Sequence, residues 1–169
     1  MAPLPSEEQK VFEHLRSKHA QLITVESCTG GQVADRLTNL PGSSENYFGG
    51  FVAYDNLAKQ GFVGLDKELL LKHGAVSEPV AQAMAEGALK ILMREKSGSP
   101  LYLAIATTGI AGPGGGTDNK PVGLCFVSVA TSAGQTRIKR VQAPENSNRL
   151  ENKKFFADEA LKLADSLLS

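Results

Sequence analysis

The sequence predicts a single α/β domain of three layers, α/β/α, with a mixed sheet in the middle. Segments with helical and strand-like patterns alternate along the chain. Some of the strand-like segments are continuously apolar, as strands covered on both faces are. The length of 169 residues, with 41% hydrophobic and 21% charged residues, suits one globular core. We therefore expect one domain over residues 1–169, without repeats or linkers.

The first helix, strand and second helix follow an extended lead over residues 1–5. Ser6 followed by two glutamates is typical of a helix start, and an apolar stripe continues this helix to His19. The β-branched run over 21–27 predicts a strand. A glycine pair and helical spacing over 33–40 then predict a strand, tight turn and helix in sequence.

Turn residues and short helices characterise the next part of the chain. The segment PGSSEN, residues 41–46, has turn chemistry. A second short strand is expected over 49–54, with Tyr54 at its end. The segments 55–62 and 66–74 have the patterns of two short helices.

A long helix and a buried strand are predicted in the middle of the chain. Ser77 followed by glutamate and proline indicates an N-cap, and the apolar face continues until residues 96–100 break it. The near-continuously apolar run over 101–109 predicts a central strand, which leads into a Gly-rich loop over 110–121.

The carboxy-terminal part predicts a hairpin and a last helix. The hairpin turns across residues 132–135, and its second strand, 136–143, alternates enough to be half exposed. From Asn146 onward, apolar residues at helical spacing mark a final amphipathic helix.

Charge and cysteine content exclude several classes of function. Eighteen Lys and Arg balance eighteen Asp and Glu, so no whole-surface attraction to nucleic acid or anionic membrane is expected. No long apolar window or targeting segment is recognisable, which favours a cytoplasmic protein without membrane contact. The only cysteines, Cys28 and Cys125, have no metal-binding spacing and are expected to be reduced thiols.

The turn over residues 26–31, ESCTGG, is the first candidate binding element. Its small residues at a helix start would leave backbone N–H groups free for a phosphate or a carboxylate. The alternative is a simple tight turn before a capped helix. The spacing matches neither the dinucleotide nor the triphosphate fingerprint.

The Gly-rich segment over 109–116 is the second candidate. Ligands of open α/β sheets lie beyond the carboxyl ends of strands, so this loop and the first turn could face one crevice. Glycines would allow the backbone to approach a ligand closely. The alternative is a flexible surface loop.

The third candidate consists of polar residues around the second strand: Ser43, Ser44, Tyr54 and Lys59. A desolvated lysine can act as the base that activates a serine, and a tyrosine can orient the pair. The alternative is a serine cap, a tyrosine at the edge of the core and a solvated lysine.

Cys28 is an alternative nucleophile, because a thiol at a helix start near Glu26 and Lys59 could be activated. The three histidines, residues 14, 19 and 73, lie far in sequence from the Gly-rich turns. Neither a Ser-His-Asp triad nor a histidine metal site is therefore expected.

The segments VESCTGG, PGSS, GGFVAYDNLAK, HGAVSEP, TTGIAGPGGG and KPVGLCFVSVAT resemble, in order and spacing, the CinA carboxy-terminal domain family. The resemblance covers about residues 6–168. It is to the form of the family in which this domain stands alone. It implies an amidase that hydrolyses the carboxamide of nicotinamide mononucleotide to nicotinate mononucleotide and ammonia, in pyridine nucleotide recycling. It also implies no metal or other cofactor, and a homodimer or higher homo-oligomer.

The resemblance implies roles for individual residues. Ser44 matches the nucleophile, Lys59 the base and Tyr54 a supporting tyrosine. The matched substrate-binding positions are Ser27, Thr29, Gly30, Thr108, Gly109 and Arg149. The chain reads Ser147-Asn148-Arg149 where relatives commonly have Gly-Asp-Arg, which bears on phosphate affinity. Ala53 stands where threonine is usual.

Two further readings remain open at the level of the sequence. A protein that binds a nucleotide without turning it over would keep the pocket, but it would not need the serine, tyrosine and lysine together. An amidase of another small amide fits the same residues. A pyrophosphatase would usually need clustered carboxylates for a divalent metal, and no such cluster is recognisable in the sequence.

Overall fold

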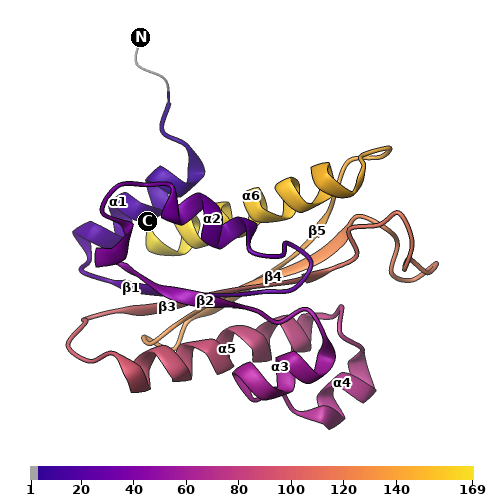
Figure 1. Cartoon of the computed structure of the whole chain (residues 1–169), viewed down its shortest axis with the longest axis horizontal. Helices are drawn as coiled ribbons and strands as arrows, with labels where there is room; N and C mark the ends of the chain where they lie inside the picture. The colour runs from indigo at the N-terminus through magenta and orange to yellow at the C-terminus, as the bar shows by residue number, and fades with distance from the viewer. Residues whose placement is uncertain (1–3) are drawn as a thin grey trace.

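The protein folds as a five-stranded mixed sheet between two layers of helices (Figure 1). The computed structural model describes residues 4–169, so part of the extended lead lies outside the described residues. The strand order is β2-β1-β3-β4-β5. Strands β1, β2 and β3 are parallel, whereas β4 and β5 are antiparallel to their neighbours. The predicted α/β architecture with a mixed sheet is confirmed.

The strands are β1 (Gln21–Glu26), β2 (Tyr47–Val52), β3 (Tyr102–Gly109), β4 (Leu124–Thr131) and β5 (Thr136–Gln142). The helices are α1 (Glu7–Ser17), α2 (Gln32–Thr38), α3 (Asn56–Val63), α4 (Lys67–His73), α5 (Glu78–Glu95) and α6 (Arg149–Leu168). A 3₁₀ turn, η1, spans Ser43–Glu45. None of the helices formed by residues 4–169 is long and apolar enough to cross a bilayer.

Burial along each strand follows its position in the sheet. Every residue of β1 is buried and β3 is buried up to its last residue, because both strands are interior and helices cover both faces. Strand β2 alternates and β5 is largely exposed, as expected for the two edges. The chain therefore places its continuously apolar runs at the centre of the sheet.

Two separate cores hold the helices to the sheet. On one face α1, α2 and α6 pack around Phe156 and Leu103, and on the other α3, α4 and α5 pack around Met84 and Ile23. Helix α5 approaches α3 closely at Gly87, where a Cβ would lie 2.1 Å from the Val63 carbonyl oxygen. This close packing holds α3 beside the carboxyl end of β1.

The helix caps agree with the sequence signals at most ends. Ser6 begins α1 with a capping box, and Asn148 begins α6 with another. Asp55 accepts a hydrogen bond from the first turn of α3. Ser77 occupies the N-cap position of α5, but its hydroxyl donates to the Gly74 carbonyl instead of accepting from the helix. The predicted role of its side chain as a cap is wrong.

The predicted end of the second strand also needs correction. Strand β2 begins at Tyr47 and ends at Val52, so Tyr54 lies two residues beyond it. Tyr54 is 59% exposed, and Asp55 directly afterwards turns the chain into α3. The aspartate cap breaks the strand earlier than the apolar pattern suggested.

The turn between β1 and α2 is held by the buried carboxylate of Glu26. Its Oε2 accepts from the backbone N–H of Gly31 and Val33, and its Oε1 accepts from Ala34. The Thr29 hydroxyl donates to Oε2 over 2.6 Å. Because the carboxylate is 1% exposed, it satisfies the first-turn donors in place of water or a ligand.

We expect Glu26→Gln to lower the free energy of unfolding by about 3 kcal/mol, because an amide N–H₂ would face backbone donors at a buried site. Urea unfolding followed by circular dichroism measures this. Glu13→Gln is the matched control, since Glu13 is exposed on α1. A loss of stability no larger in Glu26→Gln than in this control contradicts the structural role of the carboxylate.

Candidate active site

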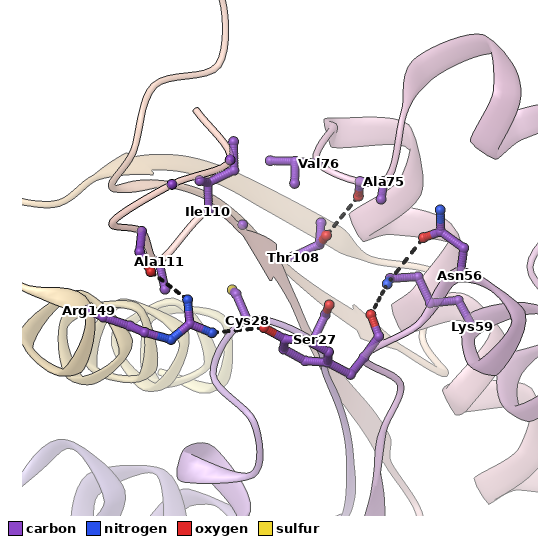
Figure 2. A pocket seen from close by; sticks show the side chains of 15 residues that line it. Ser27, Cys28, Asn56, Lys59, Ala75, Val76, Thr108, Ile110, Ala111 and Arg149 are labelled. Atoms are coloured by element: carbon purple, nitrogen blue, oxygen red, sulfur yellow. Dashed lines mark hydrogen bonds between the residues drawn. The ribbon is translucent and has the colours of Figure 1, made fainter. Parts of the chain in front are cut away.

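A cavity of ≈ 270 Å³ opens beyond the carboxyl ends of the parallel strands (Figure 2). Residues that follow β1, β2 and β3 line it, together with the segment before α5 and the start of α6. Parallel strands end at the same edge of a sheet, which is where open α/β sheets hold ligands. Because these strands run in the same direction, segments that are distant in sequence meet at this cavity.

Both small-residue turns predicted to share a crevice do so. Ser27 and Cys28 from the first turn face the cavity, and Gly109, Gly112 and Gly115 belong to the opposite wall. The expectation that the two turns face one crevice is confirmed. Part of the Gly-rich loop thus lines the cavity, while residues 113–119 are exposed at the surface.

The amino group of Lys59 is held inside the cavity wall. Its Nζ donates to the Tyr54 carbonyl oxygen at 3.0 Å and lies 3.5 Å from the Asn56 Oδ1. The residue is only 2% exposed. Burial lowers the pKa of Lys59 below its usual 10.5, and electrostatic interactions with Asp55 and Cys28 oppose this shift. The neutral amine needed by a general base is therefore more accessible than in a solvated lysine.

Tyr54 contacts both cationic side chains of the cavity, but through different atoms. Its carbonyl accepts from Lys59, while its hydroxyl accepts from the Arg149 Nη2 at 2.8 Å. The tyrosine hydroxyl is thus engaged with the arginine. Tyr54 positions Lys59 by its backbone.

Arg149 stands at the opposite side of the cavity from Lys59 (Figure 2). Its Nη1 donates to the Gly112 carbonyl at 2.6 Å, and Asn152 of the same helix donates to the Ala111 carbonyl at 3.0 Å. Both contacts tie α6 to the Gly-rich loop. The hydrogen-bond partners of the Arg149 guanidinium, the Gly112 carbonyl and the Tyr54 hydroxyl, carry no charge.

The lining contains two cations and, among the described residues, no Asp or Glu. Lys59 and Arg149 therefore create a positive potential that no carboxylate of the wall cancels. A cavity of this charge favours an anionic ligand. Because the net charge of the whole chain is zero, attraction of an anion has to come from a local group of cations such as this one.

The two aliphatic hydroxyls of the cavity wall, those of Ser27 and Thr108, differ in their hydrogen bonding. Thr108 donates to the Ala75 carbonyl at 2.7 Å, so its proton is committed. The Ser27 hydroxyl bonds to no acceptor or donor among residues 4–169, although the residue is only 7% exposed. Ser27 thus offers a free hydroxyl in the same cavity as Lys59.

Ser44 does not lie in this cavity within one chain. It is exposed in η1, before β2, whereas Tyr54 and Lys59 follow β2. Six extended residues separate the two ends of the strand by about 20 Å. The structure does not bring Ser44 and Lys59 of one chain together.

Thr29 and Gly30 also lie outside the cavity lining. The Thr29 hydroxyl is fully buried between Glu26 and Thr107, at 2.6 and 2.7 Å. The first-turn amides expected to bind a ligand already bind the carboxylate of Glu26. The group that accepts these hydrogen bonds at the helix start is therefore the Glu26 side chain and not a bound ligand.

Two features of the site were not predicted from the sequence. Asn56 and the segment Ala75–Val76 line the cavity; they belong to the segments DNLAK and HGAVSEP, which resemble the family but did not point to these residues individually. The second is that the Cys28 and Cys125 sulfurs are 3.6 Å apart.

No group of three or more His, Cys, Asp or Glu side chains within the described chain is arranged to hold a metal ion.

The fold is that of an α/β domain with a cavity beyond the carboxyl ends of its parallel strands, the place where open α/β sheets commonly hold ligands. The sequence profile described as the CinA C-terminal domain matches residues 5–168. The chain belongs to the CinA C-terminal domain family.

Individual relatives support this membership. A CinA-like protein of Chloroherpeton thalassium is 48% identical over 164 residues, which cover 96% of this chain and 37% of that protein. The chain thus spans little more than a third of this relative. In the structure of the competence/damage inducible protein CihA from Agrobacterium tumefaciens, identity is 34%, both chains are covered fully, and the TM-score is 0.85. A CinA superfamily protein from Klebsiella pneumoniae is 28% identical over 96% of this chain and 95% of its own, with a TM-score of 0.85.

The lowered pKa of Lys59 predicts a pH-dependent stability. Between that pKa and 10.5 the unfolded chain binds more protons than the folded one, so the contribution of Lys59 to the free energy of unfolding rises with pH. We expect the unfolding free energy of the wild type relative to Lys59→Met to increase from pH 7 to pH 10, by at most about 1.4 kcal/mol per pH unit.

Urea unfolding at several pH values measures this difference. Lys90→Met, at an exposed lysine of α5, is the control and should show no such trend. Parallel pH curves for the wild type and Lys59→Met would contradict the desolvation of Lys59.

Proposed function

We propose that the protein is a metal-independent amidase that hydrolyses the carboxamide of nicotinamide mononucleotide to nicotinate mononucleotide and ammonia. The observation that carries the proposal is the shared cavity of Lys59, with its lowered pKa, and the free hydroxyl of Ser27. The guanidinium of Arg149 in the wall suits a substrate with a phosphate. Family membership agrees with this proposal, and the reaction would serve pyridine nucleotide recycling.

The chemistry requires a nucleophile, a base and an acid. Lys59 as the neutral amine removes the hydroxyl proton while the serine oxygen attacks the carboxamide carbon. The resulting ammonium of Lys59 protonates the leaving nitrogen, and ammonia departs from an acyl-enzyme. Water, deprotonated by Lys59, then attacks the ester and releases the carboxylate and the serine.

The Gly-rich loop is the proposed oxyanion site. The backbone N–H groups of Gly114 and Gly115 donate to no acceptor among residues 4–169, and both residues line the cavity. Two such donors aimed at the carbonyl oxygen would stabilise the negative charge that develops there. Arg149, on the far wall from Lys59, would then hold the phosphate.

The geometry of one chain favours Ser27 as the nucleophile, in place of the Ser44 that the family resemblance implies. Ser27 needs no movement of the backbone to share a cavity with Lys59. Cys28 lines the same cavity, but its sulfur lies against that of Cys125. Ser44 remains a candidate if a second copy of the chain supplies it.

A homodimer provides a route for Ser44. Strand β2 is an edge of the sheet, and exposed apolar side chains lie on it and on α3: Phe48, Val52, Leu57 and Phe62. An unpaired edge of this kind is suited to pairing with another strand. Antiparallel pairing of two β2 strands would set the partner's Ser44 near the carboxyl end where Lys59 lies. We propose such a dimer in the cytoplasm, where the two free cysteines would be reduced.

A binding protein without catalytic activity is the competing reading. It would account for Arg149 and the loop, but a buried lysine with a lowered pKa beside a free hydroxyl has no purpose in such a protein. Tight binding of the mononucleotide without ammonia release would favour it. Ammonia release from another small amide at a higher kcat/KM would identify a different substrate.

We expect Ser27→Ala and Lys59→Met each to lower the kcat of ammonia release from nicotinamide mononucleotide by roughly 10³-fold, whereas Ser44→Ala changes it by about twofold or less. In the wild type, kcat should rise with pH through the lowered pKa of Lys59, since only the neutral amine accepts the proton. A coupled ammonia assay from pH 6 to pH 10 measures both.

The outcome that contradicts the Ser27 assignment is an active Ser27→Ala with an inactive Ser44→Ala. Mixing Ser44→Ala with Lys59→Met then tests the dimer, because heterodimers carry one intact site when Ser44 comes from the partner. Light scattering gives the oligomeric state of each variant. Lys90→Met, exposed and far in sequence from the cavity residues, is the control for lysine replacement.

We expect Arg149→Met to raise KM for nicotinamide mononucleotide by 10-fold or more, on the order of a lost charge-assisted phosphate contact, and to leave KM for nicotinamide riboside nearly unchanged. Tyr54→Phe is the matched control, because it removes one hydrogen-bond partner of Arg149 and keeps the charge. Equal losses with both substrates would show that Arg149 only supports the Gly-rich loop.

A further inference from the structure

The two cysteines of the chain form a contact pair at the wall of the cavity. Cys28 and Cys125 are 97 residues apart in sequence, and their Sγ atoms are 3.6 Å apart. Cys28 is 4% exposed and lines the cavity, whereas Cys125 is fully buried in β4. One thiol can therefore be reached from the cavity, and the other lies directly behind it.

The sheet brings the two sulfurs together across an intervening strand. Cys28 follows β1 and Cys125 belongs to β4, while β3 lies between these strands. Cys125 is paired in register with Gly109 of β3, where a Cβ would lie 2.8 Å from the Cβ of Cys125. The missing side chain of Gly109 leaves the space through which the two cysteine side chains meet. Both belong to the same core cluster, on the α6 side of the sheet.

We propose that Cys28 and Cys125 are a redox-sensitive modification site, at which a hydroperoxide entering the cavity converts the thiol pair into a disulfide. In the first step the Cys28 sulfur attacks the peroxide, the O–O bond breaks, and Cys28 sulfenic acid and an alcohol or water form. In the second step the Cys125 sulfur attacks the sulfenic sulfur. The S–S bond forms, the S–O bond breaks, and water leaves with the proton of the Cys125 thiol. The peroxide is reduced and the two thiols are oxidised, so electrons and atoms balance.

The positions of the two thiols decide which of them reacts first. Cys125 is shielded from the cavity by Cys28, and burial raises its pKa, so it is a poor first nucleophile. Cys28 meets the oxidant, and Cys125 acts as the resolving thiol because its sulfur is already in contact. A pair held this way forms a bond faster than Cys28 meets a second oxidant.

Disulfide formation moves the wall that carries Ser27. An S–S bond is about 2.05 Å long, so the sulfurs must approach by about 1.5 Å. Thr29 is held by Glu26 and Thr107, and Cys125 lies within the β3·β4 ladder. The displacement therefore falls on Cys28 and strains the backbone hydrogen bonds of the neighbouring Ser27, whose N–H donates to the Thr107 carbonyl and whose carbonyl accepts from Gly30. A shift of about 1 Å in a reacting group lowers turnover by roughly 10²-fold, so oxidation switches the cavity off; this consequence rests on the proposed amidase function.

Peroxide treatment of the purified full-length chain tests the proposal. The wild type and Cys125→Ala are incubated with hydrogen peroxide and then with dithiothreitol. Three quantities are followed: free thiols by Ellman titration, the Cys28–Cys125 crosslink by peptide mass spectrometry, and amide hydrogen exchange of the 26–34 turn. Ammonia release is measured in parallel. Cys125→Ser is the second variant, in case the small cavity left by alanine prevents folding.

We expect the wild type to lose both thiols together, to gain the crosslink, to change exchange in the turn and to lose activity at least tenfold. Dithiothreitol should reverse all four changes. Cys125→Ala should form no crosslink and should not regain with dithiothreitol any activity lost to overoxidation of Cys28. Two free thiols that persist, or a crosslink that leaves exchange and activity unchanged, overturn the proposal. If the untreated protein releases no ammonia, the amidase function fails, and the crosslink and the exchange change still decide the redox site.

Discussion

The buried carboxylate of Glu26 is the constraint on which the arrangement of the site depends. It binds backbone donors of Gly31, Val33 and Ala34 and the hydroxyl of Thr29, and so it fixes the turn between β1 and α2. A helix of seven residues has little stability of its own, and these contacts with the carboxylate hold its first turn in place. Since Ser27 and Cys28 belong to this turn, the same carboxylate decides which side chains reach the cavity. It also explains why this helix start is not free to bind a ligand.

Charge is distributed unevenly although the chain carries equal numbers of cations and anions. On the outer helices and the edge strand β5, several charges are paired: Arg36 with Glu8 and Asp158, and Glu159 with Lys139 and Lys162. Lys59 and Arg149 instead hydrogen-bond to neutral carbonyl and hydroxyl oxygens, although the Asp55 carboxylate, outside the cavity lining, acts electrostatically on Lys59. One small region thus has a positive potential on an otherwise balanced surface. An anionic substrate would be attracted to this cavity without non-specific binding elsewhere.

The sequence predicted most of the fold because its signals are local. A β-branched run gave β1, a near-continuous apolar run gave β3, helical spacing gave α5 and α6, and Ser6 marked the start of α1. The two small-residue turns were correctly expected to share a crevice, since both follow strands of one sheet. The end of β2 and the cap role of Ser77 were wrong, because neighbouring polar residues competed for the same backbone groups. Family resemblance pointed to Lys59 and Arg149, and both line the cavity.

By itself, the sequence determined the class of fold, the approximate elements and several residues of the candidate site, because periodicity, capping and motif spacing act over short stretches of chain. Only the tertiary structure decided which of these residues meet. Strand direction separates Ser44 from Lys59 by the length of β2 and places Ser27 in the same cavity as Lys59. Sheet order and the missing side chain of Gly109 bring Cys28 to Cys125 across β3. Contacts of this kind depend on long-range strand pairing, which spacing along the sequence does not encode.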